Sequence, residues 1–177
     1  TRICADFPKI NPAQIAIDPG LPKEKHMRWA ALLRHQAPEE AVAILRQLKL
    51  DNDTINRVKT LVQWWKRPIG ADQTQIRKTM SQMAPELYDD LLVLKTSVGE
   101  LELQAEGCVE DLDWVKTQSR EIRQRGDCVS LKELAVTGAD LIQSGMKPGK
   151  ELGETLKRLL ELVLEHPEWN TKEILKK

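Results

Sequence analysis

The segment GMKPGKELG, residues 145–153, has the residue types of a phosphate-binding turn. It places three glycines and a proline within nine positions and sets two lysines around the central turn. Free amide N–H groups at a helix start, the positive end of the helix dipole and the lack of bulky side chains all favour an anion there. Two further bases extend the positive charge along the expected helix. The candidate phosphate contacts are Lys147, Gly149, Lys150, Lys157 and Arg158.

The same segment also has an interpretation without a ligand. Glycine ends helices in a left-handed conformation, so Gly145 can simply stop a helix that Thr137 caps. Pro148, with its fixed φ, then opens the next helix at its first position. Gly149 and Gly153 lie one turn apart, where they let another backbone approach closely. Capping and packing would explain all of these residues, and the spacing by itself leaves both interpretations open.

A second cluster of positive charge lies on an expected helix over residues 110–125. Lys116, Arg120 and Arg123 follow i, i+4, i+7 and so share one face. Arg125 is expected beside them. Such a stripe is typical of contacts with nucleic-acid phosphates. Bases near the end of a helix also suit its dipole without any ligand, so the stripe is either a phosphate-binding face or an ordinary solvated one.

Residue types and composition restrict the other classes of function. The three histidines have no metal-ligand spacing and the three cysteines form no CxxC pair, so we expect no metal and no cofactor on this chain. An odd number of scattered cysteines fits reduced thiols in the cytoplasm. No apolar run approaches the ~18 residues of a membrane span, which argues against a membrane partner. The net charge is zero, so any contact with nucleic acid must be local.

Apolar residues recur at helical spacing, and no convincing period-2 alternation appears. Pro38 and Pro85 suit first helical positions, and Asp72 with Gln75 forms a capping pair. The pattern predicts an all-α, elongated multi-helix array with a C-terminal glycine-hairpin helical subdomain. Helices are expected over residues 23–36, 38–48, 55–65, 72–83, 85–106, 110–125, 138–144 and 148–163.

The domain organisation is predicted from changes in composition and in element length along the chain. The first 22 residues contain four prolines and a glycine and are expected to be a loop or a linker from a preceding domain. Since the chain begins with Thr1, we expect a piece of a longer protein. After Gly126 and Asp127 the elements become shorter and glycine becomes denser. The predicted domains are a linker at 1–22, a helical body at 23–128 and a helical tail at 129–177.

The tail resembles a known family. The stretch VTGADLIQSGMKPGKELGETLKRLLELVLEHPEWNTKEIL, residues 136–175, resembles the C-terminal region of bacterial class II tRNA nucleotidyltransferases, which include CCA-adding enzymes and related poly(A) polymerases. In that family a GxDL turn precedes a GxxPGxxxG hairpin and a leucine-rich helix. RWAALL at 28–33 and AVAILRQLKLDNDTINRVKTLV at 41–62 resemble the helical body of the same family. The residues that match the tail pattern are Gly138, Asp140, Leu141, Gly145, Pro148, Gly149 and Gly153.

The resemblance implies a tRNA-binding role without the family's catalytic residues. The family's head carries a Gly-Ser turn followed by a DxD pair, which holds Mg²⁺ ions beside CTP or ATP. Here Asp51/Asp53 and Asp111/Asp113 have DxD spacing but no such turn, and their places at expected helix starts favour capping. An EDxxR motif, which selects the incoming base in the family, is also absent because no arginine follows Glu110-Asp111 at the required position.

The resemblance therefore implies that this chain holds the acceptor/TΨC elbow of tRNA for a catalytic head outside it, and that by itself it transfers no nucleotide. Trp64, Trp65, Trp114 and Trp169 are candidates for stacking on bases, although apolar neighbours favour the core for Trp65 and Trp114. Two alternatives remain open: a helical protein-interaction scaffold, and a helix-hairpin-helix module that binds DNA. Lys95, on an unrelated expected helix, is the reference position for substitutions in the hairpin.

Overall fold

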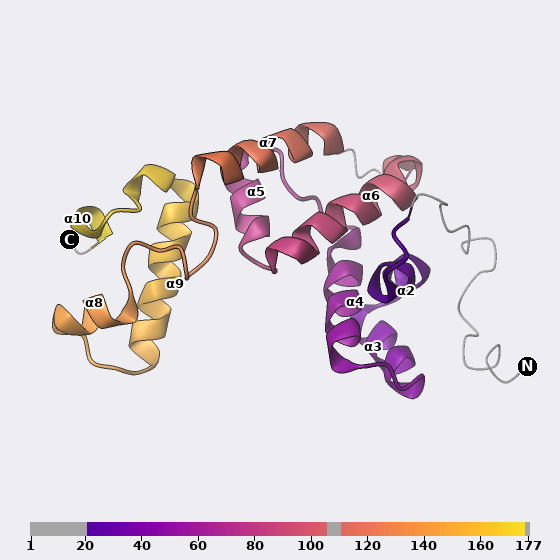
Figure 1. Cartoon of the computed structure of the whole chain (residues 1–177), viewed down its shortest axis with the longest axis horizontal. Coiled ribbons are helices and arrows are strands. Elements are labelled where there is room, and N and C mark those ends of the chain that lie inside the picture. Colours follow the sequence, from indigo (N-terminus) through magenta and orange to yellow (C-terminus); the bar gives the residue numbers. More distant parts are fainter. Residues whose placement is uncertain (1–20, 106–110, 176–177) are drawn as a thin grey trace, which may run out of the picture. The chain divides into compact units, whose positions relative to one another are not determined.

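All secondary structure in the part of the chain that the structure describes is helical, which confirms the all-α prediction (Figure 1). The computed structural model describes residues 21–105 and 111–175. The elements are α2 (Lys25–Leu33), α3 (Pro38–Gln47), α4 (Asn52–Trp65), α5 (Gln73–Met80), α6 (Pro85–Ala105), α7 (Leu112–Arg125), α8 (Gly138–Gln143), α9 (Lys150–Glu165), the 3₁₀ turn η2 (Pro167–Trp169) and α10 (Lys172–Leu175).

Local capping signals place several helix boundaries. Asp51 caps α4 by accepting a hydrogen bond of 2.8 Å from the backbone N–H of Thr54. Asp72 accepts an equivalent bond of 2.8 Å at the start of α5. Thr137 and Asp140 form a reciprocal capping box on α8, because each side chain accepts a hydrogen bond from the other's backbone N–H. These bonds satisfy amide groups that a helix start leaves without partners.

Contacts divide the chain into two compact units that are not contiguous in sequence. The first contains the described residues within 21–68 and 83–112, and the second contains 69–82 with the described residues from 113 onward. The second unit therefore includes α5, which lies between α4 and α6 in the sequence. The sequence predicted a domain boundary near residue 128. That boundary stays a prediction, because the grouping of contacts does not test whether the segment after residue 128 folds by itself.

The first unit packs α2, α3, α4 and α6 around a well-buried core. Its largest completely buried side chains include Met27, Leu45, Leu61 and Trp65, in agreement with the apolar spacing of these helices. None of the helices in the described ranges has an apolar stretch that would reach across a bilayer.

Lys95 lies inside this first core and is unsuitable as the neutral reference position that the sequence suggested. It is 1% exposed, and its Nζ donates a hydrogen bond of 2.7 Å to the carbonyl oxygen of Arg67, just beyond α4. A buried ammonium at the carbonyl end of a helix is stabilised by the helix dipole. Substitution of Lys95 would therefore disturb the fold, and reference substitutions belong at exposed positions.

The second unit has a smaller core built on α9. The buried residues of this core come from the segment that follows α7, from α8, from the last turns of α9 and from α10. Along α9, apolar residues at steps of three and four are packed against this core but remain only partly buried. The buried members are Cys128, Leu134, Val136, Leu141, Val163 and Leu175, and the partly buried ones on α9 are Leu152, Leu156, Leu159 and Leu160.

Two positional predictions in this unit are wrong. Pro148 was expected at the first position of a helix, but α9 begins at Lys150 and Gly149 is its N-cap residue. Trp114 was expected in the core, but it is 36% exposed. The buried face of α7 carries Val115 and Ile122, and the rotation of about 100° per residue turns Trp114 away from that face.

Candidate functional site

The glycine hairpin connects α8 to α9 and leaves the first turn of α9 without a side-chain cap. Gly145 has φ +99° and ends α8, and Gly149 has φ +156° immediately before α9. Both conformations are ones that residues with a side chain rarely adopt, so glycine is required at each position. Since glycine at the N-cap provides no oxygen acceptor, no N-cap side chain covers the amide N–H groups at the start of α9.

The predicted close approach of another backbone at these glycines does not occur within the described residues. A Cβ added at Gly149 or Gly153 would meet no atom within 4 Å. By contrast, a Cβ at Gly138 would lie 3.4 Å from Leu152 Cδ2, so that glycine is in packing contact. Gly153 lies inside α9 and has no positive φ. It therefore has neither a conformational nor a packing reason among the residues that the structure describes.

The candidate bases on and near α9 differ in their surroundings. Lys147 is exposed and precedes the helix. Lys150 Nζ lies 3.6 Å from Glu154 Oε1, and both side chains are largely exposed. Lys157 and Arg158 are exposed further along, on a helix that carries three bases and four acids. Lys147 therefore precedes the helix, whereas Lys150 and the two bases further along lie on a helix with four carboxylates.

The stripe predicted on α7 is present at its three main positions. Arg120 and Arg123 are exposed, and Lys116 is half-buried with its Nζ 3.5 Å from Asp113 Oδ1. Arg125 does not extend the stripe as expected. Its guanidinium reaches Asp127 and Gln73, because two residues beyond Arg123 the helix has turned by about 200°.

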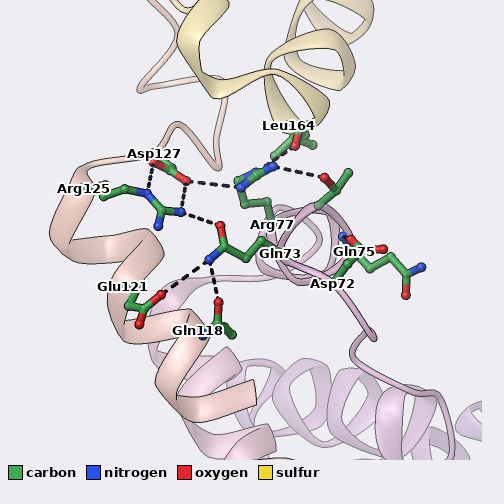
Figure 2. Close-up of polar contacts among 10 residues, drawn as sticks. Asp72, Gln73, Gln75, Arg77, Gln118, Glu121, Arg125, Asp127 and Leu164 are labelled. Carbon is green, nitrogen blue, oxygen red and sulfur yellow. Dashed lines mark hydrogen bonds and ion pairs between the residues drawn. The ribbon is translucent and has the colours of Figure 1, made fainter. Parts of the chain in front are cut away.

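A buried polar junction, which sequence reasoning did not identify, connects α5, α9 and the segment after α7 (Figure 2). At its centre Arg77 is 4% exposed. Its Nε donates to the carbonyl oxygen of Leu164 (2.8 Å), its Nη1 to Asp127 Oδ2 (3.3 Å) and its Nη2 to Thr74 Oγ1 (3.1 Å). The only sequence signal would have been an arginine at a core position of an amphipathic helix, next to Ile76 and Met80.

Asp127 is shared between two arginines at this junction. Arg125 donates from Nε to Asp127 Oδ1 (3.2 Å) and from Nη2 to Asp127 Oδ2 (2.9 Å), and Nη2 also donates to Gln73 Oε1 (2.8 Å). This hydrogen-bonded carboxylate raises the pKa of Arg125 above its usual value. A hollow of about 750 Å³ lies beside the junction. Two arginines and two acids line it, Arg77 and Arg125 with Asp127 and Glu168, so it has no net charge to attract a phosphate.

The hairpin and the junction lie at opposite ends of α9 (Figure 1). Leu164, which Arg77 contacts, is one residue from the last residue of the helix, whereas the hairpin precedes the first. A helix of 16 residues at about 1.5 Å per residue is about 24 Å long. The candidate residues therefore form two separate surfaces: a hairpin surface (Lys147, Gly149 and Lys150) and an α7 stripe (Lys116, Arg120 and Arg123).

The tryptophans give little support for a base-stacking platform. Trp65 is completely buried, as expected, and the guanidinium of Arg67 lies 5.4 Å above the ring of Trp64. Trp169 is 36% exposed and stacks on His166, with ring centroids 4.0 Å apart and the ring planes at 18°. A neighbouring side chain therefore already occupies one face of the Trp169 ring.

All four aspartates with DxD spacing were predicted to lie at helix starts, and the structure confirms this for Asp51, Asp53 and Asp113. Asp51 caps α4, and its hydrogen bonds to Thr54 lower its pKa to about 2. Asp53 lies in the first turn of α4 and pairs with Arg57 (3.0 Å), and Asp113 lies in the first turn of α7. Within the described ranges, no three metal-ligating side chains lie close enough together to hold an ion. Glu110, which was compared with the first residue of the family's EDxxR motif, lies outside the described residues.

A comparison with known families gives a match over nearly the whole described chain. Residues 22–177 match the family model of tRNA nucleotidyltransferase domain 2. Neither a curated protein nor a solved structure matches the chain. The match includes both the hairpin surface and the α7 stripe.

Proposed function

The chain belongs to the tRNA nucleotidyltransferase domain 2 family, and from this premise we propose that it is a tRNA-binding portion of such an enzyme. In this proposal the chain holds the acceptor/TΨC elbow of tRNA and positions the 3′ end for a catalytic head outside the present sequence. Mg²⁺ and CTP or ATP would bind that head. The observation that carries the proposal is the family match over residues 22–177.

The hairpin surface supports the proposal chemically. Its uncapped amide N–H groups, the positive end of the α9 dipole and the exposed Lys147 together suit one phosphate group. Open space beside Gly149 and Gly153 allows an RNA backbone to reach the first turns of α9 without a steric barrier. We assign Lys147, Gly149 and Lys150 to the primary contact, with Lys157 and Arg158 as weaker contributors because they lie two turns beyond the uncapped amides at the start of α9.

The α7 stripe is the second proposed contact. Arg120 and Arg123 are exposed on a helix whose opposite face is buried, so both side chains lie on the solvent side of α7. Guanidinium and ammonium groups that bind phosphates recognise the backbone and the shape of an RNA rather than its sequence. Such recognition suits a protein that has to accept many different tRNAs.

Equilibrium binding of the chain to three ligands tests the proposal. The ligands are intact tRNA, an acceptor/TΨC minihelix and a DNA duplex of equal length, each at two salt concentrations because phosphate contacts depend strongly on salt. We expect both RNAs to bind more tightly than the DNA, with the minihelix retaining most of the affinity. A preference for the DNA duplex would support the helix-hairpin-helix alternative, and no binding to any of the three would favour a protein-interaction scaffold.

A further inference from the structure

Arg77 connects three separate segments of the second unit through a single buried side chain. Its three nitrogens donate to the carbonyl of Leu164 near the end of α9, to Asp127 just after α7, and to Thr74 on its own helix (Figure 2). Both side chains of the Arg77–Asp127 pair are more than nine-tenths buried, at 5% and 7% exposure. A buried charge pair with satisfied hydrogen bonds resists separation, because breaking it leaves an uncompensated charge in the interior.

These contacts fix the end of α9 relative to the end of α7. Asp127 follows α7 by two residues, and Arg125 on the last turn of α7 binds the same carboxylate. Leu164 lies in the last turn of α9. The exposed pair Lys78–Glu165 (2.6 Å) joins α5 to α9 beside them, but a solvent-exposed ion pair contributes little to stability. The buried guanidinium is therefore the main polar connection between the two helix ends.

We propose that Arg77 is a positioning residue that sets the separation of the hairpin surface from the α7 stripe, so that both can bind one RNA molecule at the same time. This inference rests on the proposed function of those two surfaces. α9 is a rigid rod with the hairpin at one end, so a small rotation at Leu164 moves the hairpin by several ångströms. Arg77 holds the end about which such a rotation would occur.

The physical consequence is an effective-concentration effect. When two contact surfaces belong to one rigid body, the second contact forms almost without additional entropic cost, whereas a loose connection lowers the effective concentration of the second surface. Loss of Arg77 would then weaken RNA binding although Arg77 itself is buried and touches no ligand. The affinity loss would come from the hairpin surface, which would engage the RNA less often.

The test compares Arg77→Met with Lys78→Ala in the full chain. Methionine fills much of the arginine volume without its hydrogen bonds, and Asp127 keeps its two bonds to Arg125. Lys78→Ala is the matched control, since Lys78 is the next residue on the same helix and reaches the same partner helix from the solvent side. If Arg77→Met does not fold, Arg77→Lys replaces it, because an ammonium keeps the charge but cannot bridge all three acceptors.

Two readouts are needed, both on protein shown to be folded by near-UV circular dichroism. Hydrogen exchange should become faster in α9 and α10 of Arg77→Met and stay unchanged in α2–α4, and Lys78→Ala should resemble the wild type. The affinity for tRNA should fall about tenfold. In the Arg77→Met background, Lys147→Glu should cost much less affinity than it does in the wild type, because the hairpin is no longer held in place.

Additive effects of Arg77→Met and Lys147→Glu would overturn the positioning role, since a residue that only stabilises the fold leaves the contribution of Lys147 unchanged in folded protein. Unchanged exchange in α9 would overturn it as well. Failure of the proposed function is distinguishable from both outcomes: the wild type would then not bind tRNA at all. That result would remove the RNA role of Arg77, and hydrogen exchange would still decide whether Arg77 fixes α9.

Discussion

The fold does not explain why position 153 is occupied by glycine. It lies in α9, where glycine costs stability relative to alanine, and a Cβ at this position would meet no neighbour within 4 Å. Gly138, by contrast, has a packing contact at 3.4 Å, and Gly145 and Gly149 have positive φ angles. A helical glycine that lies near an uncapped helix start and faces open space is suited to close approach by a ligand backbone.

We predict that Gly153→Ala stabilises the chain and weakens its binding to tRNA. Alanine removes backbone freedom from the unfolded chain and should raise the free energy of unfolding by about 0.5–1 kcal/mol. The added methyl group would keep an RNA backbone away from α9. Urea unfolding and tRNA titration measure the two effects on the same sample. If the variant is more stable and binds tRNA as the wild type does, Gly153 has no role in the contact.

Asp51 is a helix cap whose contribution depends on pH. Hydrogen bonds from Thr54 lower its pKa from 3.8 to about 2 in the folded chain. Because the folded pKa is depressed, the stabilisation is fully present above pH 3.8 and is lost as the pH falls through about 2. Asparagine also caps helices but does not titrate.

We therefore expect Asp51→Asn to have a lower Tm than the wild type near pH 6, because the neutral amide lacks the charge-assisted bonds of the carboxylate. This difference should shrink as the pH is lowered from 4 toward about 2, where the carboxylate of the wild type becomes protonated. Thermal scans at several pH values measure the difference. A Tm difference that stays constant over this range would show that the charge of Asp51 does not contribute to the cap.

At the scale of elements, the two helices with candidate bases differ in how their charges are compensated. α9 carries four acids among its three bases, whereas its flanking hairpin presents Lys147 with no acid beside it in sequence. The exposed surface of α7 concentrates Arg120 and Arg123 on one flank. Counting bases along a helix therefore overestimates its attraction for phosphate when carboxylates occupy the same face.

For α9 we predict that Lys147→Glu weakens tRNA binding more than Lys157→Glu. The hairpin lysine lies next to the uncapped amides, while Lys157 lies within the acid-rich part of the helix. Equilibrium binding at fixed salt compares the two variants, and Arg28→Glu on α2 of the first unit is the exposed control. Equal losses from Lys147→Glu and Lys157→Glu would extend the contact along the whole helix, and equal behaviour of all three variants would exclude the hairpin.

For α7 we predict that Lys116→Glu combined with Arg120→Glu lowers both the affinity for tRNA and the slope of log K against log salt. Each lost phosphate contact should reduce the slope by about one unit, because fewer counterions are released on binding. Titrations at four or more salt concentrations give the slope directly. If the slope stays that of the wild type, the stripe is an ordinary solvated face of α7.

At the scale of the whole molecule, each of the two compact units is built from two separate segments of the chain. The chain passes between them near residues 68, 82 and 112, so that α5 belongs to the second unit although helices of the first unit precede and follow it. The segment 129–177 lacks Cys128 of its own core, and it also lacks Arg77 and Asp127, which hold the end of α9. The predicted tail domain is thus smaller than the unit in which it packs.

We predict that a fragment of residues 129–177 does not unfold cooperatively by itself. A core of so few buried side chains is marginal, and the junction at Arg77 would be missing. Circular dichroism during heating provides the measurement, with the full chain as the reference. A sharp transition near the Tm of the full chain would show instead that the tail is an independent domain with the boundary that the sequence suggested.

The sequence by itself determined the features that depend on near neighbours in the chain. Apolar spacing predicted the all-α class, and capping residues such as Asp72 and Thr137 predicted helix starts, because the bonds involved join residues three positions apart. The hairpin and the α7 stripe were likewise identified from local spacing. Their role in binding tRNA is still a prediction.

The tertiary structure decided what depends on residues far apart in the sequence. Arg77 and Leu164 are 87 positions apart, and Arg77 and Asp127 are 50 apart, so no local pattern could pair them. Burial of Lys95 and the turn of Arg125 toward Gln73 depend on which helices pack together. In our proposal the distance between the hairpin and the α7 stripe has the same origin, because Arg77 anchors the far end of α9.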